Sequence, residues 1–387
     1  MRAPLSDRHY LDHASTSFLR PEAARAMSTW LEMACSGDPG RVHVEGRVVR
    51  DAIEGAREAV AALLGTTANR VVFTSGATEA ANTAIFAAGQ SRPDAPMICA
   101  DVEHSCVREA AGRRGPVLVL EVDSKARIDL DHLETLLAAD HAGRPALVNC
   151  QWCNHEVGTL QPVAEIVACC RAAGVPVHVD AAAAVGHLPV ELDSLGADFV
   201  SVSAHKLGGP TGIGALVVRR GLRLEPLIVG GAQERARRAG LENVIGIVGF
   251  AGAAAALSEP GRLPEEEAAA RQLTSALLEA ATSVEDVLVL GDTLQRAPHI
   301  VNVAVGGVLA EAVLLGLDRS GIAAHSGSAC SSESIEPSPV LTAMGADPDR
   351  SLRLSVGWST TSADLEAFVA AFAPVVERLR ALGTSVS

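Results

Sequence analysis

From about residue 20 to residue 255 the chain repeats one pattern, in which short apolar runs of strand length alternate with longer segments of helical period. Runs that are apolar at nearly every position are typical of parallel strands buried on both faces and joined by helices. We expect these strands at 71–73, 96–100, 146–152, 177–180, 199–202 and 213–218. The pattern predicts an α/β domain built on a mostly parallel sheet.

After about residue 258 the pattern changes, because a segment rich in Pro, Gly and Glu interrupts it. Beyond that segment we expect, in order, a helix to about 282, strands near 287–290 and 300–305, a helix from 309, a strand near 353–356 and an amphipathic helix over 363–382. A chain of 387 residues is longer than one compact core usually fills. We therefore predict a large domain over 15–257 and a smaller α+β domain formed by 1–14 and 258–387.

Composition and charge narrow the class of protein. Hydrophobic residues make up 48% of the chain and charged residues 20%, which suits a globular protein with a large core. The net charge of −14 argues against nucleic-acid binding, and the basic patch 235–238 is expected to be a solvated or phosphate-facing loop. The start of the chain lacks the apolar core of a signal peptide, and the longest apolar stretch, 245–257, is too short to span a bilayer. We expect a soluble, cytoplasmic protein that does not bind a membrane.

The eight cysteines do not indicate a disulfide scaffold in a chain of this length. The pairs Cys150/Cys153 and Cys169/Cys170 lack a second pair at zinc-finger spacing, so we expect no structural metal site. Most of the cysteines are expected to be small core residues.

Lysine is almost absent from the chain, which makes each lysine informative. Of 32 basic residues only Lys125 and Lys206 are lysines, so Arg supplies the ordinary surface charge. A guanidinium cannot lose its proton to act as an amine nucleophile, whereas an ammonium can. Lys125 lies in a polar turn, where a solvated residue is expected. Lys206 lies between an apolar strand and a glycine-rich segment, and it is the candidate for amine chemistry.

Ligands of open α/β sheets bind outside the carboxyl ends of the strands, and polar features of this chain fall at such ends. The loop 74–78 enters a helix, and its free N–H groups suit a phosphate, although a plain helix cap explains the loop equally well. Asp180 ends a buried strand and needs a positive partner there, unless it caps a helix. The protonated pyridine nitrogen of pyridoxal 5'-phosphate (PLP), an electron-withdrawing cofactor, would be such a partner.

Further polar side chains surround Lys206 in the sequence or precede another helix. Ser203 and His205 could donate to a phosphate, and the glycines of 208–214 let another backbone approach closely. His104 falls at the expected start of a helix, where its ring could stack on an aromatic cofactor or simply pack as a buried histidine. These features predict a PLP enzyme in which Lys206 holds the cofactor as a Schiff base.

One cysteine differs from the others in its surroundings. Cys330 lies in a run of Gly and Ser, 326–332, which predicts an exposed loop, whereas Cys99 and Cys169 lie in apolar segments. Exposure is the precondition for thiolate chemistry, so Cys330 is the candidate nucleophilic thiol.

The chain resembles the cysteine desulfurases of the NifS/IscS-like group, within the class V aminotransferase family of fold-type I PLP enzymes. The resemblance runs almost from end to end and rests on the segments 10–16, 73–79, 103–104, 154–162, 178–181, 203–210, 230–235, 326–330 and 352–361. The form Ser-Gly-Ser-Ala-Cys at 326–330, followed by Glu-Pro-Ser, is similar to the subgroup with the longer cysteine loop.

This resemblance implies a role for each matching residue. Lys206 forms the internal Schiff base and later moves protons, Asp180 pairs with the pyridine nitrogen, and His104 stacks on the ring. The phosphate is held by Ala77, Thr78, Ser203 and His205. Arg353 binds the substrate carboxylate, and Cys330 attacks the substrate sulfur, leaving alanine and a persulfide on Cys330.

Three positions depart from the family pattern. His155 replaces the second Asn of Asn-Asn-Glu, which contacts the cofactor ring oxygen or the substrate. Ala183 replaces a Gln, and Leu241 replaces the Thr that reaches the phosphate of the partner subunit. These changes leave the Schiff base intact and alter the hydrogen bonds around it.

We therefore expect a homodimer that desulfurates L-cysteine and passes sulfur to an acceptor or scaffold protein, as in iron–sulfur cluster assembly or tRNA thiolation. One alternative keeps PLP and changes the reaction to that of a selenocysteine lyase or another class V lyase or transferase. A second alternative, motivated by the three departures, is a degenerate PLP-fold protein that acts as a binding partner or scaffold.

Overall fold

The computed structural model describes residues 8–33, 35–139, 144–326 and 337–384. Its central sheet contains β2 (Val71–Thr74), β3 (Met97–Ala100), β4 (Val117–Leu120), β5 (Leu147–Gln151), β6 (Val177–Asp180), β7 (Phe199–Ser203) and β8 (Gly214–Val218). The seven strands lie in the order β2-β8-β7-β6-β5-β3-β4. Only β8 runs antiparallel to its neighbours, β2 and β7, so the predicted mostly parallel sheet is confirmed.

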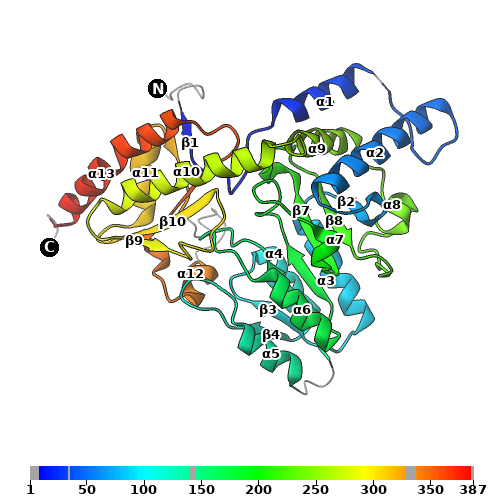
Figure 1. Cartoon of the computed structure of the whole chain (residues 1–387), viewed down its shortest axis with the longest axis horizontal. Coiled ribbons are helices and arrows are strands. Elements are labelled where there is room, and N and C mark those ends of the chain that lie inside the picture. The colour runs from blue at the N-terminus through cyan, green and yellow to red at the C-terminus, as the bar shows by residue number, and fades with distance from the viewer. Residues whose placement is uncertain (1–7, 34, 140–143, 327–336, 385–387) are drawn as a thin grey trace.

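Helices cover both faces of this sheet (Figure 1). They are α1 (Pro21–Glu32), α2 (Val44–Leu63), α3 (Ala77–Ser91), α4 (Ser105–Arg114), α5 (Leu130–Ala138), α6 (Val163–Ala173), α7 (Leu192–Leu195), α8 (Gln233–Ala236) and α9 (Val244–Leu257). Successive strand residues point to opposite faces, so Val71 and Phe73 pack in one core while Val72 packs in the other. Burial on both faces explains why the strands are apolar at nearly every position.

A second, smaller unit follows at one end of the long axis in Figure 1. It comprises β1 (His9–Tyr10), α10 (Arg262–Thr282), β9 (Val287–Leu290), β10 (Ile300–Val305), α11 (Ala310–Arg319), β11 (Ile322–Ala323), α12 (Pro339–Ala343), β12 (Ser351–Ser355) and α13 (Ser362–Thr384). Its antiparallel sheet has the order β12-β10-β9, and β1 pairs with β11. Leu11 belongs to the core of this unit although it lies near the start of the chain. Val340 and Leu341 of α12 pack in the core of the larger unit. The separate core formed by the other elements supports our proposal that the domains are 15–257 and 1–14 with 258–387.

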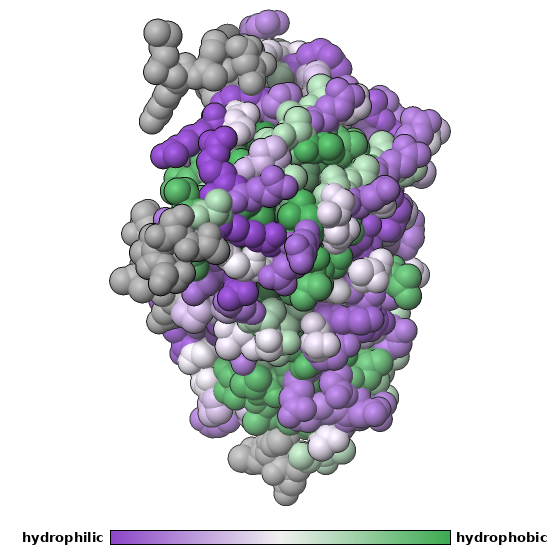
Figure 2. Space-filling model, turned by 90° about the vertical axis from the view of Figure 1, so that its left-hand side faces the viewer, coloured by the Kyte–Doolittle hydropathy of each residue, from purple (hydrophilic) through white to green (hydrophobic). Residues whose placement is uncertain are grey.

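Figure 2 shows the end of the molecule formed by the smaller unit, where apolar patches lie between hydrophilic side chains. None of the helices in the described ranges has, by itself, both the length and the hydropathy of a membrane span. The pair α9 and α10 meets that criterion only when the two helices are taken together, across a bend of 81°.

Candidate active site

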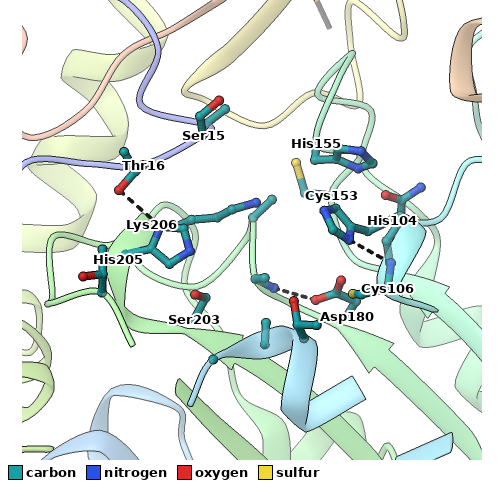
Figure 3. Close-up of a pocket in the computed structure, with 18 of the residues that line it drawn as sticks. Ser15, Thr16, His104, Cys106, Cys153, His155, Asp180, Ser203, His205 and Lys206 are labelled. Carbon is teal, nitrogen blue, oxygen red and sulfur yellow. Dashed lines mark hydrogen bonds between the residues drawn. The ribbon is translucent and has the colours of Figure 1, made fainter. Parts of the chain in front are cut away.

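A cavity of about 640 Å³ opens at the carboxyl edge of the central sheet (Figure 3). Because this edge collects the ends of β2, β5, β6 and β7, segments that are distant in sequence meet there. The cavity is lined by residues expected from the sequence, namely Ala77, Thr78, His104, His155, Asp180, Ser203, His205, Lys206 and Arg353. It is also lined by residues for which no role was predicted, including Ser15, Thr16, Cys106, Gln151 and Cys153.

Lys206 lies in the 3₁₀ turn Ala204–Lys206, directly after β7, and its side chain extends into the cavity (Figure 3). Burial lowers the pKa of the Lys206 amine, the nearby Asp180 carboxylate opposes this shift, and the Arg353 guanidinium adds to it. A lowered pKa increases the fraction of neutral amine, which is the nucleophilic form. Lys125 is half exposed and lies 3.7 Å from Asp292, outside the cavity.

Asp180 ends β6 and is held by a chain of buried hydrogen bonds. Its Oδ1 accepts from Ser201 Oγ at 2.9 Å and from the Ala182 N–H at 3.0 Å. Ser201 Oγ lies 3.1 Å from His178 Nε2, and His178 Nδ1 lies 3.1 Å from Asn149 Oδ1. Burial lowers the pKa of His178 to about 4, so this imidazole is neutral near pH 7. The network fixes the carboxylate at the floor of the cavity. The bond from the Ala182 N–H closes a local turn, which is the contact expected if Asp180 also acts as a cap.

The other side of the cavity offers donors suited to a phosphate. The helix α3 begins at Ala77, so the first N–H groups of this helix lack intrahelical acceptors. Ser203 ends β7, and His205 follows it with its Nδ1 3.2 Å from Thr16 Oγ1. Burial lowers the pKa of His205 to about 4, with Lys206 adding to the effect.

Two imidazoles form the wall opposite Lys206 in Figure 3. His104 caps α4, with its Nδ1 accepting from the Cys106 N–H at 3.2 Å. Its ring centroid lies 5.1 Å from that of His155, and the two ring planes are inclined at 62°. Burial lowers the pKa of both rings, and Lys206 contributes in each case. Both side chains are therefore neutral near pH 7.

Arg353 lies on β12 of the smaller unit, and its side chain lines the cavity. Its Nη1 donates to the His155 carbonyl at 2.8 Å, and its Nη2 donates to Asp12 Oδ1 at 2.8 Å and to Ser15 Oγ at 2.6 Å. The residue is only 4% exposed, and its Nε has no hydrogen-bond partner among the described residues. Arg353 thus forms an ion pair with Asp12 and also keeps a donor for a ligand.

The departures from the family pattern fall in two places. His155 and Ala183 line the cavity, whereas Leu241 is 62% exposed and lies beside a different, smaller cavity. Two ion pairs involve the basic patch: Arg235 pairs with Glu54 and Arg238 pairs with Glu79. The patch therefore pairs with one acidic residue of α2 and with one in the first turn of α3.

Cys330 lies outside the described residues, so its predicted role stays a prediction. The described residues on either side of that gap lie near the cavity. The backbone of His325 pairs with that of Arg353, and Ser338 Oγ donates to Glu156 Oε2 at 2.6 Å. Among the described residues, no group of three or more His, Cys, Asp or Glu side chains is arranged to hold a metal ion.

Comparison with known proteins defines the class. The family model for aminotransferase class V matches residues 9–368, so the chain belongs to that family. A cysteine desulfurase of a Nostoc species is 39% identical over 389 residues, covering 96% of this chain and 94% of the relative. A cysteine desulfurase IscS of Dictyoglomus turgidum is 37% identical and covers 96% and 95%. The structure of a NifS-like protein from Rickettsia africae is 29% identical, with a TM-score of 0.87 over 96% of this chain and 99% of that one.

Enzymes of this family use PLP, and the residues of this cavity fit that cofactor. A buried amine, a carboxylate fixed at the end of a strand and helix N–H groups meet in one cavity. These are the partners that the aldehyde, the pyridine nitrogen and the phosphate of PLP require. The orphaned Nε of buried Arg353 provides a further donor toward a carboxylate.

Proposed function

We propose that this chain is a cysteine desulfurase that converts L-cysteine to L-alanine and retains the sulfur as a persulfide on Cys330. The observation that carries the proposal is the convergence of Lys206, Asp180, His104 and Arg353 on one cavity. Relatives named cysteine desulfurase, similar over nearly the whole chain, favour this reaction over the other PLP chemistries and over a scaffold role.

The proposed mechanism assigns each step to a side chain. Bound PLP supplies an electron sink for the bonds at the substrate α- and β-carbons. Lys206, whose amine pKa is lowered by burial, takes and returns the proton at the α-carbon. Asp180 keeps the pyridine nitrogen protonated, and its bond from Ser201 orients the carboxylate for that task.

Arg353 and His104 position the substrate and the ring in this mechanism. The guanidinium of Arg353 holds the substrate carboxylate through the donors that its protein partners leave unused. His104 stacks on the cofactor ring from the wall of the cavity. Ala77, Thr78, Ser203 and His205 hold the phosphate, and His155 contacts the ring oxygen or the substrate.

The thiolate of Cys330 completes the reaction. It attacks the substrate sulfur, a new S–S bond forms, the C–S bond breaks, and the carbon receives a proton to give alanine. The persulfide then passes its outer sulfur to an acceptor protein, such as a scaffold for iron–sulfur clusters, in the cytoplasm.

A homodimer is part of the proposal. Large apolar side chains are exposed near the residues 227–241 and the start of α2: Val42 is 85% exposed, Val44 60%, Val229 74% and Leu241 62%. Residues of 38–41 and of 232–242 line one cavity, so the exposed side chains belong to neighbouring segments. Exposed apolar residues on neighbouring segments are typical of an interface, and a second copy of the chain is the proposed partner.

The test is an assay of purified, PLP-loaded protein with L-cysteine and a reductant, in which alanine and sulfide are both quantified. We expect equal amounts of the two products. The Cys330→Ala variant should keep the visible band of the bound cofactor and form no persulfide, because the acceptor thiol is removed. Desulfuration at the wild-type rate by that variant would place the nucleophile elsewhere, and wild-type protein that releases no alanine would refute the proposed function.

A further inference from the structure

Two histidines stack behind the cavity, and neither has a role in the mechanism above. The rings of His187 and His299 lie with their centroids 3.5 Å apart and their planes within 7° of parallel. His187 follows β6 in the larger unit, and His299 immediately precedes β10 in the smaller unit. The stack therefore joins the two units, and it does so next to the main chain of Lys206.

The His187 ring contacts the main chain of Lys206, and the main chain of His299 contacts the chain just after β12. His187 Nε2 lies 3.2 Å from the backbone carbonyl oxygen of Lys206. Because a carbonyl oxygen only accepts, this nitrogen carries the proton and donates it. The carbonyl of His299 accepts from the Val356 N–H at 3.0 Å, immediately beyond β12, the strand that carries Arg353. A continuous path thus runs from the Lys206 main chain to the Arg353 strand.

The environment of the pair favours stacking of neutral rings. Burial lowers the pKa of His187 to about 3 and that of His299 well below its usual range. His299 is 1% exposed, and its Nδ1 has no hydrogen-bond partner among the described residues. Leaving a buried polar atom without a hydrogen bond costs free energy. The position of the His299 ring is therefore not explained by a hydrogen bond from its Nδ1. What the side chain contributes is a flat surface for His187.

We infer that the His187–His299 stack is a positioning pair, which fixes the main chain of Lys206 against the strand that carries Arg353. The stack thereby sets the separation between the amine that holds the cofactor and the guanidinium that holds the substrate carboxylate. Because reacting groups must be placed within a fraction of an ångström, a shift of 1 Å between the two units costs up to about 100-fold in rate. This inference rests on the roles that the proposed function gives to Lys206 and Arg353.

The experiment compares variants that keep or remove the flat ring. His299→Phe keeps a ring for His187, whereas His299→Ala and His299→Leu remove it, and the leucine also fills the space. The matched control is Phe372→Ala, which removes one ring of the Phe368–Phe372 stack, at 5.0 Å and 21°, inside the core of the smaller unit. Three properties are measured for each protein: the visible circular dichroism of bound PLP without substrate, KM and kcat for L-cysteine, and the midpoint of thermal unfolding.

We expect His299→Ala and His299→Leu to change the circular dichroism of the cofactor and to raise KM about tenfold, with a smaller effect on kcat. His299→Phe should restore both properties to within about threefold of wild type, and Phe372→Ala should lower only the thermal midpoint. If His299→Leu binds PLP with the wild-type circular dichroism and KM, the inference is wrong and the stack is merely structural. A wild-type protein without a cofactor band would instead refute the proposed function, and the inference with it.

Discussion

At the scale of single residues, Arg353 has partners on both sides of the boundary between the two units. The bonds to His155, Asp12 and Ser15 use three of its five N–H hydrogens, and they leave the Nε–H and one Nη1 hydrogen. The residue was predicted from its family motif, but Asp12 and Ser15 were not predicted as its partners. Asp12 and Ser15 lie more than 330 residues away from Arg353 in sequence, and no local pattern predicts a contact at that separation.

The variant Arg353→Lys tests whether the guanidinium binds the substrate. A lysine keeps the charge but loses the planar fork, so we expect KM for L-cysteine to rise tenfold or more while the visible band of bound PLP remains. That factor corresponds to the loss of about 1–3 kcal/mol from one charged hydrogen bond. Asp12→Asn serves as the control, because it weakens the ion pair and leaves the guanidinium in place. An unchanged KM in Arg353→Lys would mean that Arg353 only links the two units.

Some site residues could be predicted from the sequence and others could not, as Lys206, Asp180 and His104 show when they are compared with His187 and His299. Asp180 is the last residue of an apolar strand, and Lys206 and His104 follow the ends of two others, so the strand pattern itself places them at the ligand-binding edge. The stacked pair His187 and His299 gave no such signal, because each ring packs against a residue more than 100 positions away.

At the scale of secondary-structure elements, the pattern of apolar residues predicted strand β8 but not its direction relative to the neighbouring strands. The strand is buried at every residue, as are its antiparallel neighbours β2 and β7, and a run of buried apolar residues gives no sign of the direction in which the strand runs. Its antiparallel course brings Gly214 beside the loop between β2 and α3. A Cβ at Gly214 would lie 2.5 Å from the Val202 carbonyl oxygen and 2.7 Å from the Gly76 backbone.

The Gly214→Ala variant should therefore displace the start of α3, where the phosphate is expected to bind. We predict an affinity for PLP about tenfold lower or more, measured by titrating the cofactor into apoprotein. Gly55→Ala on the exposed face of α2 is the control, because a Cβ there meets no atom within 4 Å. That control should keep the affinity and gain up to about 1 kcal/mol of stability from its higher helix propensity. Wild-type affinity in Gly214→Ala would show that Gly76 does not shape the phosphate site.

At the scale of the whole molecule, the composition and the change of pattern after residue 258 predicted two units, and the structure has a separate core in each. What the sequence could not give is the electrostatic state of groups buried between elements. Glu103 was known only as part of a family motif, yet it is 1% exposed, and burial raises its pKa to about 8. Its Oε1 accepts from the Gln151 N–H at 2.7 Å, while its Oε2 has no partner among the described residues.

This buried carboxyl predicts a pH dependence of stability. Because the folded pKa lies above the unfolded value, the proton is held in the folded state, and stability decreases as pH rises from about 4.5 to about 8. Glu103→Gln removes this loss, so the variant should match wild type near pH 5 and be more stable by a few kcal/mol, about 5 at most, at pH 8. Thermal unfolding of the two apoproteins across this range measures the effect. A difference that does not change with pH would show that Glu103 is not protonated in the fold.

The central claim is that Lys206 carries PLP, and the near-absence of lysine makes it directly testable. The loaded protein is reduced with borohydride, digested, and the peptides are mapped for the pyridoxyl group by mass spectrometry. We predict the group on Lys206 alone, and no label in Lys206→Ala, because Lys125 is the only other lysine and lies outside the cavity. Label on Lys125, or a loaded protein with no label on either lysine, would contradict the account.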